Sequence, residues 1–168
     1  MNTFYHDLGL FFCVFHGDRI YLTYHQLMPI SKEELNIVAI IPARGGSKGL
    51  PKKNLVEICG QPLISWSIEQ AKSTNFISST WVTSDDEQIL KTAEKFGAFA
   101  IKRPPELALD NSSSESAWIH AIDYINKINK NVDIVVGMQG TSPIREPDDL
   151  DKAISLFIDK KFDSLLTV

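Results

Sequence analysis

Strand-like and helix-like segments alternate along the chain from residue 37 onward, and this alternation restricts the fold more than any other feature. Residues 37–41 form an apolar, mostly β-branched run closed by Pro42, as expected of a strand buried on both faces. Further strands are predicted at 80–83, 98–101, 132–138 and 164–168, and helices at 63–73, 85–96, 115–128 and 147–160. Strands separated by single helices predict an α/β fold, with a Rossmann-like, mostly parallel sheet and helices on both faces.

The length, composition and net charge of the chain limit the kinds of protein it can be. Its 168 residues are 43% hydrophobic and 23% charged, which suits one compact domain. The formal net charge of −4 gives no basic field for nucleic acid or an anionic membrane, and no apolar run near residues 8–15 approaches the ~20 residues of a membrane span. The two cysteines have no metal-binding or redox spacing, so we expect a cytoplasmic protein.

Residues 1–36 differ from the rest of the chain. They are rich in aromatic residues and contain three of the four histidines, His6, His16 and His25. These histidines are not closely spaced and lack the accompanying set of carboxylate or thiol ligands that a metal site needs. We expect an N-terminal extension of unknown role at 1–36 and a nucleotide-binding part of a domain at 37–168. Because the sequence stops on the first residues of a strand, we expect a fold that is incomplete at its C-terminus.

The loop after the first buried strand, residues 42–54, carries the clearest chemical signal. It holds four cations within ten residues and no acid, together with three glycines. The cations are Arg44, Lys48, Lys52 and Lys53. Glycines let backbone amides converge on an anion, while arginine and lysine bind phosphate oxygens. A polyphosphate site is therefore favoured over a solvated basic turn, although the loop has neither the Walker A spacing nor the dinucleotide fingerprint.

The same loop, read as the segment 41–54 (IPARGGSKGLPKKN), resembles the N-terminal signature of the N-acylneuraminate cytidylyltransferases, or CMP-sialic acid synthetases. Four later segments agree in order: 81–86 (WVTSDD), 103–108 (RPPELA), 139–145 (QGTSPIR) and 163–168 (DSLLTV). The resemblance implies a C-terminally truncated nucleotidyltransferase that joins CTP to an acidic nine-carbon 2-keto sugar. The products would be a CMP-sugar and pyrophosphate.

The resemblance also implies residue roles. Arg44 and Lys53 would be catalytic and would hold the CTP phosphates, while Gln139 and Arg145 would bind the sugar acid. The nucleotide-binding set would be Arg44, Gly45, Gly46, Ser47, Lys48, Asn54, Arg103, Ser112 and Ser114. Arg103 would reach the cytosine, since a guanidinium can donate to the base carbonyl. For Ser112 the spacing to Glu115 also predicts a capping box at a helix start.

Other implications of the resemblance concern groups outside this sequence. Mg²⁺ is the expected cofactor, with ligands mostly beyond residue 168, and a homodimer is expected for the full-length protein. Asp85 and Asp86 are interpreted as partners of a helix dipole rather than as metal ligands. No metal ligand is therefore predicted within the chain.

Two departures from the family pattern bear on these implications. The sialate enzymes usually have proline where this chain has Gly140, and the related keto-deoxyoctonate enzymes have an acid where it has Thr141, so the loop agrees with the sialate enzymes except at one residue. The second departure is that the family's metal-binding aspartates, much of its sugar site and its dimerisation segment are expected beyond residue 168. Most contacts that distinguish the acceptor sugars are expected there too. Cytidylyltransferases for legionaminic, pseudaminic or keto-deoxyoctonic acid are therefore alternatives. A non-catalytic nucleotide-binding domain is another, because fold does not fix activity, and this chain alone is expected to have weak or no turnover.

Overall fold

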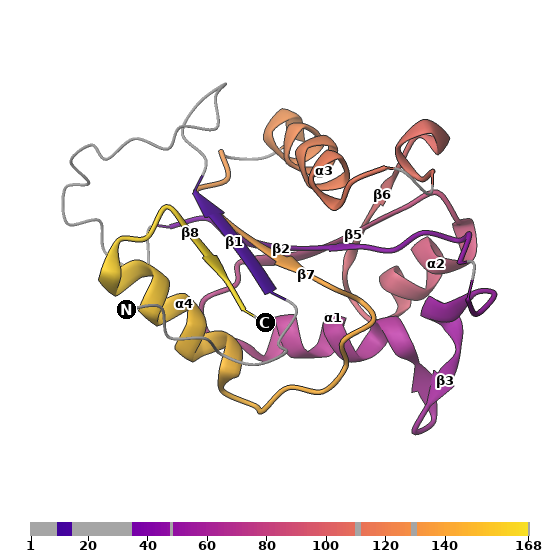
Figure 1. Cartoon of the computed structure of the whole chain (residues 1–168), viewed down its shortest axis with the longest axis horizontal. Coiled ribbons are helices and arrows are strands. Elements are labelled where there is room, and N and C mark those ends of the chain that lie inside the picture. The colour runs from indigo at the N-terminus through magenta and orange to yellow at the C-terminus, as the bar shows by residue number, and fades with distance from the viewer. Residues whose placement is uncertain (1–9, 15–34, 48, 110–111, 129–130, 168) are drawn as a thin grey trace.

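A six-stranded sheet forms the centre of the molecule (Figure 1). The computed structural model describes residues 10–14, 35–47, 49–109, 112–128 and 131–167. Across the sheet the strands are β6 (Phe99–Lys102), β5 (Ser79–Ser84), β2 (Ile37–Pro42), β7 (Ile134–Met138), β1 (Leu10–Val14) and β8 (Ser164–Leu166). Strands β6, β5, β2 and β7 are mutually parallel, which confirms the predicted α/β class.

Strand β1 comes from the predicted N-terminal extension and lies between β7 and β8. It runs antiparallel to both neighbours, so that Phe12 is in register with Val136 on one side and with Leu165 on the other. The sequence analysis assigned no strand here, and the division of the chain at residue 36 stays a prediction. His6, His16 and His25 lie outside the described residues.

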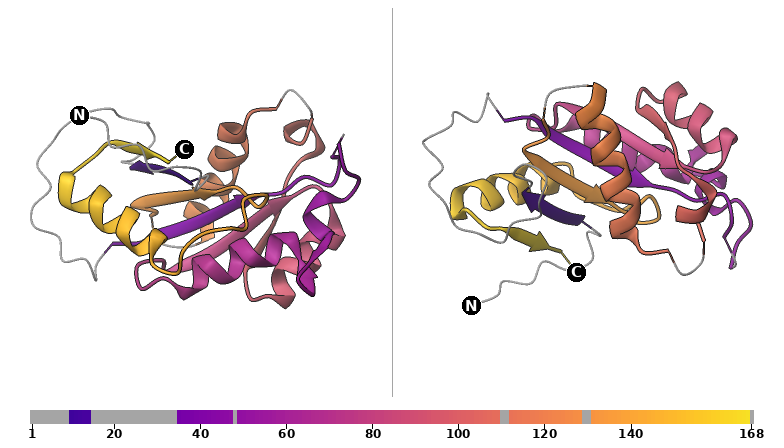
Figure 2. Two further views of the ribbon diagram at one scale, coloured as in Figure 1. Left: turned by 60° about the horizontal axis from the view of Figure 1, so that its bottom comes forward. Right: turned by 90° about the horizontal axis from the view of Figure 1, so that it is seen from above.

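Helices cover both faces of the sheet, as predicted (Figure 2). Alternate side chains of a strand point to opposite faces, so Ile37, Ala39 and Ile41 share one apolar core while Val38 and Ile40 belong to another. The first core contains α1 (Leu63–Ser73), α2 (Glu87–Lys95) and α4 (Asp149–Lys160), and the second contains α3 (Ser114–Ile128). Within the described ranges, no helix is both long enough and apolar enough to cross a membrane.

The helix termini confirm some predictions and correct others. Helix α1 has the predicted bounds, and α2 begins after Asp86, whose Oδ1 accepts from the amides of Gln88 and Ile89. The predicted cap of α3 by Ser112 is wrong. Ser113 Oγ accepts from the Ser116 amide at 3.2 Å, whereas Ser112 Oγ donates to the Glu106 carbonyl. Several adjacent serines offer the same hydroxyl, so spacing could not select among them.

The start of α4 also differs from its prediction. Pro147 was expected in the first turn, but the helix begins at Asp149 with Asp148 as its N-cap. A turn precedes it, because the Asp149 carboxylate accepts from the Glu146 amide at 2.7 Å and the Asp149 amide donates to the Glu146 carbonyl. This turn places Pro147 before the helix. The short pieces that remain are β3 (Glu57–Ile58), β4 (Gln61–Pro62) and the 3₁₀ turns η2 (Lys53–Leu55) and η3 (Pro105–Leu107).

Candidate nucleotide-binding site

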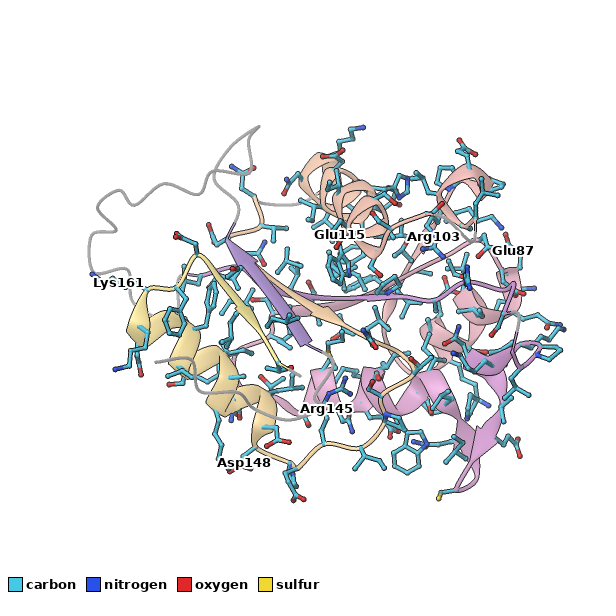
Figure 3. All side chains as sticks on the ribbon, in the orientation of Figure 1. Glu87, Arg103, Glu115, Arg145, Asp148 and Lys161 are labelled. Carbon is cyan, nitrogen blue, oxygen red and sulfur yellow. The ribbon has the colours of Figure 1, made fainter. Side chains whose placement is uncertain are left out.

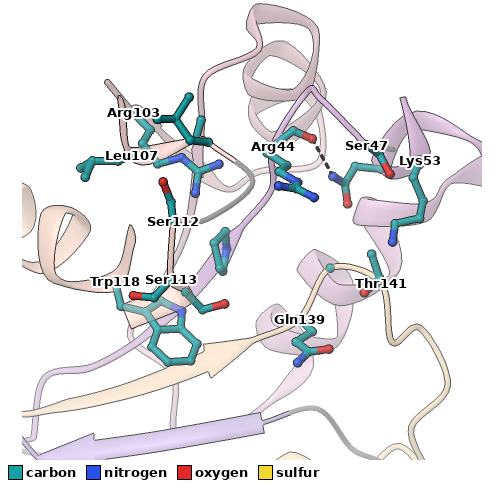
Figure 4. A pocket seen from close by; sticks show the side chains of 16 residues that line it. Arg44, Ser47, Lys53, Arg103, Leu107, Ser112, Ser113, Trp118, Gln139 and Thr141 are labelled. Atoms are coloured by element: carbon teal, nitrogen blue, oxygen red, sulfur yellow. Dashed lines mark hydrogen bonds between the residues drawn. The ribbon is translucent and has the colours of Figure 1, made fainter. Parts of the chain in front are cut away.

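A pocket of about 360 Å³ opens where the parallel strands end (Figure 4). The loops that follow β2, β6 and β7 meet there, at the edge where open parallel sheets bind ligands. The lining residues are Pro42, Arg44, Ser47, Lys53, Asn54, Arg103, Leu107, Ala108, Leu109, Ser112, Ser113, Ser114, Trp118, Gln139, Gly140 and Thr141. Three of these side chains are cationic and none is a carboxylate, which suits an anionic ligand.

The loop after β2 is held at this edge by its own backbone. The Ala43 amide donates to the Thr83 carbonyl at 3.0 Å, which continues the pairing of β2 with β5. Asn54 is buried, and its Nδ2 donates to the Arg44 carbonyl at 3.1 Å. Because Asn54 folds the end of the loop back onto its beginning, the Arg44 side chain is directed into the pocket (Figure 4).

Gly45 makes the closest approach of this loop to the rest of the fold. Its amide donates to Asp85 Oδ1 at 3.1 Å. A Cβ at this position would lie 2.8 Å from both Cβ and Oδ2 of Asp86, closer than real atoms pack. Gly45 is therefore required for the loop to pack on the start of α2, while Gly46 has open space around it.

The three loop cations that the structure describes, Arg44, Lys52 and Lys53, do not all face the pocket. Arg44 and Lys53 line the pocket, as their predicted role requires. Lys52 has a left-handed backbone, with φ of 52°, and its Nζ donates instead to Gln88 Oε1 on α2 at 2.7 Å. Lys48 lies outside the described residues. The pocket therefore draws on part of the charge cluster that the sequence identified.

Arg103 enters the pocket from the end of β6. Its side chain is only 6% exposed, and its amide donates to the Ser84 carbonyl at 2.8 Å. Nη2 lies 3.7 Å from Asp85 Oδ1, while Nε and Nη2 make no hydrogen bond to any described residue. Burial lowers the pKa of Arg103, which the Asp85 carboxylate opposes and the nearby Arg44 reinforces. A buried cation with free donors favours a ligand that brings hydrogen-bond acceptors.

One wall of the pocket comes from residues 107–109 and 112–118. It contains the predicted Ser112 and Ser114, and also Leu107, Ser113 and Trp118, which the sequence analysis did not single out. Two signals in the sequence could have identified these residues. Leu107 lies inside the segment 103–108, and Ser113 lies between the two predicted serines. Trp118 follows Ser114 by one helical turn. The indole gives the pocket one flat apolar surface.

The two predicted sugar-binding residues lie in different surroundings. Gln139 lines the pocket, but Arg145 does not. Arg145 lies beside α1, well apart from Arg103 (Figure 3), and its Nη1 donates to Gln70 Oε1 at 2.6 Å. Burial lowers the pKa of Arg145 to about 10, with the Asp149 carboxylate opposing, so the side chain is still charged at pH 7. The predicted contact of Arg145 with the sugar acid stays a prediction.

Helix α1 anchors the loop that follows β7. Ser67 Oγ donates to the Gln139 carbonyl at 3.2 Å, and Gln70 Nε2 donates to the Pro143 carbonyl at 2.7 Å. The loop that carries Gln139 and Thr141 is thus fixed from the face of the sheet opposite α3.

The carboxylates near the pocket have structural partners. Asp86 caps α2, which confirms its interpretation as a helix-dipole residue, but Asp85 does not cap the helix and instead faces Gly45 and Arg103. The described part of the chain has no group of three or more His, Cys, Asp or Glu side chains able to hold a metal ion. Mg²⁺ prefers carboxylate and phosphate oxygens, so the residues lining this pocket do not by themselves fit it.

The fold and the site together define a class: an α/β protein with a cationic pocket at the carboxyl ends of a parallel sheet. A family model described as "Cytidylyltransferase" matches residues 38–167. The chain therefore belongs to the cytidylyltransferase family, which confirms the expected resemblance.

Two curated relatives are similar over most of this chain. N-acylneuraminate cytidylyltransferase A of Danio rerio is 39% identical over 140 residues, covering 83% of this chain and 32% of that protein. Pseudaminic acid cytidylyltransferase of Campylobacter jejuni is 39% identical over 122 residues, covering 72% of this chain and 53% of that protein. The chain thus spans about a third and about half of these proteins.

A solved structure agrees in fold. CMP:2-keto-3-deoxy-manno-octonic acid synthetase in complex with CTP superposes with a TM-score of 0.63 and 28% identity, covering 75% of this chain and 48% of that one.

Proposed function

We propose that this chain is the CTP-binding part of a cytidylyltransferase that activates a sialic-acid-like 2-keto sugar acid. The observation that carries the proposal is the convergence of Arg44, Lys53 and Arg103 on one acid-free pocket within the family's region. A relative is named an N-acylneuraminate cytidylyltransferase, and a solved neighbour is described with CTP bound. These features favour a triphosphate with a cytosine base as the ligand.

In the proposed reaction, the negative charge of the CTP phosphates lies next to the cations of the pocket. The anomeric hydroxyl oxygen of the sugar forms a bond to the α-phosphorus of CTP, the bond from that phosphorus to the bridging oxygen breaks, and pyrophosphate leaves. The hydroxyl proton passes to solvent. Arg44 and Lys53 would offset the negative charge on the phosphates and hold them in line, which is the main requirement of such a transfer. Arg103 would donate to the base carbonyl.

Three further expectations belong to the whole protein. Magnesium is expected as cofactor, held by nucleotide phosphates and by carboxylates beyond residue 168, and a homodimer is expected at full length. The cytoplasm is the expected compartment on cysteine content alone. Cys59 is a free and exposed thiol, which fits a reducing environment.

Calorimetry with CTP, ATP and GTP tests the nucleotide specificity. We expect CTP to bind more tightly than the two purine nucleotides, and Arg44→Ala to weaken CTP by about tenfold or more, because a charge-assisted phosphate contact is lost. The matched control is Lys160→Ala, which removes a cation at the far end of α4 and should leave affinity unchanged. Equal affinity for all three nucleotides would contradict cytidine specificity.

A second acceptor is favoured by a specific observation, the 39% identity to a pseudaminic acid cytidylyltransferase. A longer version of the protein, assayed with sialic, legionaminic, pseudaminic and keto-deoxyoctonic acids, distinguishes these acceptors by pyrophosphate release. The 168-residue chain alone is expected to release little pyrophosphate in the same assay. CTP binding without turnover in the longer version would instead support a non-catalytic nucleotide-binding domain.

A further inference from the structure

Asp85 occupies a position that neither its interpretation as a helix-dipole residue nor the proposed reaction explains. It follows the last residue of β5, and its side chain is 27% exposed. A single oxygen, Oδ1, receives the Gly45 amide at 3.1 Å and lies 3.7 Å from Nη2 of Arg103. One carboxylate therefore touches both the loop after β2 and the arginine at the end of β6.

The surroundings of Asp85 hold it in this position. The Asp86 amide donates to Ser84 Oγ at 3.0 Å, and Lys102 Nζ donates to the Asp85 carbonyl at 3.2 Å. Asp86 is committed to capping α2, so it cannot replace its neighbour. The backbone on both sides of Asp85 is thus fixed, and its carboxylate is directed at the two loops.

Arg103 is the partner that most needs this carboxylate. Its guanidinium is buried, and Arg44 is close enough to disfavour its charge further. Two of its nitrogens have no hydrogen-bond partner among the described residues, and the residue lines the pocket. A buried guanidinium keeps one orientation only if a counter-charge holds it, because water cannot do so.

We propose that Asp85 is a positioning residue that holds the Arg103 guanidinium and the Gly45 amide in one arrangement, and so links the base-binding and phosphate-binding sides of the nucleotide pocket. The inference rests on the proposed function, because it concerns how the same pocket binds CTP. Asp85 acts through the other two residues and does not itself line the pocket.

Two substitutions separate the two contacts. Asp85→Asn keeps an oxygen for the Gly45 amide and removes the charge opposite Arg103, whereas Asp85→Ala removes both. Calorimetry with CTP and with inorganic tripolyphosphate then reports the two sides of the pocket. Asp148→Asn is the matched control, because it removes the same charge from an exposed side chain that pairs with Lys152 and does not line the pocket.

Relative to Asp148→Asn, we expect Asp85→Asn to weaken CTP binding by about tenfold and to leave tripolyphosphate binding within about twofold. Asp85→Ala should weaken both ligands. In an Arg103→Ala background, Asp85→Asn should have no further effect on CTP, since coupled residues are not additive. A residue with only a structural role would not show this dependence on Arg103, and thermal melting of each unliganded variant identifies any that fail to fold.

Two results would overturn the inference while leaving the proposed function intact. The first is that Asp85→Asn binds CTP as tightly as the control does. The second is that Asp85→Asn weakens CTP binding just as much in the Arg103→Ala background as it does when Arg103 is present. A wild-type chain that binds tripolyphosphate but has no preference for CTP would overturn both the inference and the proposed function.

Discussion

Two arginines of the predicted site have different surroundings. Arg103 is buried and lines the pocket beside Asp85, whereas the half-buried Arg145 donates to Gln70 of α1. Gln70 also donates to the Pro143 carbonyl, so its amide ties both ends of the segment 143–145 to the helix. Gln70 is thus the residue that fixes the loop leading away from β7.

We predict that Gln70→Ala lowers the free energy of unfolding by about 1–3 kcal/mol, because it removes the acceptor of one guanidinium N–H and the donor to the part-buried Pro143 carbonyl. Urea denaturation measures this change. Glu69→Ala is the control on the same helix, since Glu69 is exposed and bonds only Gln61 among the contacts described. Equal losses in the two variants would show that the loop is not held through Gln70.

Among the elements, α3 carries the clearest correction. Its first turn is capped by Ser113, one residue after the serine that the capping-box spacing selected. Ser116 Oγ returns a hydrogen bond to the Ser113 carbonyl at 2.8 Å, so this pair closes the turn from both sides. The same turn forms part of the pocket wall, which couples the stability of the helix start to the shape of the site.

We predict that Ser113→Ala destabilises the chain by about 1 kcal/mol, the usual effect of removing an N-cap hydroxyl. Ser112→Ala is the matched control one residue away, and it should change the unfolding free energy by less than half of that amount. The reverse order of the two effects would restore the capping box predicted from the sequence.

Ser113→Ala should also change how the stability of the chain depends on pH. The Glu115 pKa lies below its usual value, through a hydrogen bond from its own amide and another from Ser113. A lowered carboxylate pKa adds stability that is present above the unfolded pKa and is lost as pH falls through the folded pKa. In Ser113→Ala this loss should be smaller, because part of the cause is gone. Unfolding free energies measured between about pH 5 and pH 2 in both proteins report the difference.

Hydrophobic periodicity predicted the helices and strands well where the pattern was strong. It did not predict how the side chains of the loops are oriented. The buried run 37–41 and the apolar face of α1 appear as predicted, since hydrophobic burial fixes both. The loop cations Arg44 and Lys53 line the pocket, but Lys52 turns away because of its left-handed backbone. Tertiary contacts decide such orientations, and for that reason the sequence could not identify the bridging position of Asp85.

At the scale of the whole molecule, the sheet combines segments from both ends of the chain. The pocket depends on β2, β5, β6 and β7, which are parallel neighbours. Strand β1 adds an antiparallel strand beyond them, and β8 reaches the sheet only through β1. A short apolar run such as 10–14 has no period long enough to predict this placement.

We therefore predict that deletion of residues 1–27, which keeps Met28 as the first residue, lowers the melting temperature by at least about 5 °C. The deletion removes the backbone partner of β7 on one side and the partner of β8. Deletion of residues 1–8 is the control, because it keeps β1 intact, and circular dichroism measures both. In the full chain, Phe12→Pro should also destabilise, since proline cannot donate within a central strand. No change in either variant would mark the extension as dispensable.

The place of β1 also sets an order of events during synthesis. Strand β1 is synthesised well before its partners Val136 and Leu165. Contacts between such distant residues form slowly, because a long loop must close first. The parallel pairs of β2, β5 and β6 need none of these contacts, so these three strands can assemble before β7 and β8 are made.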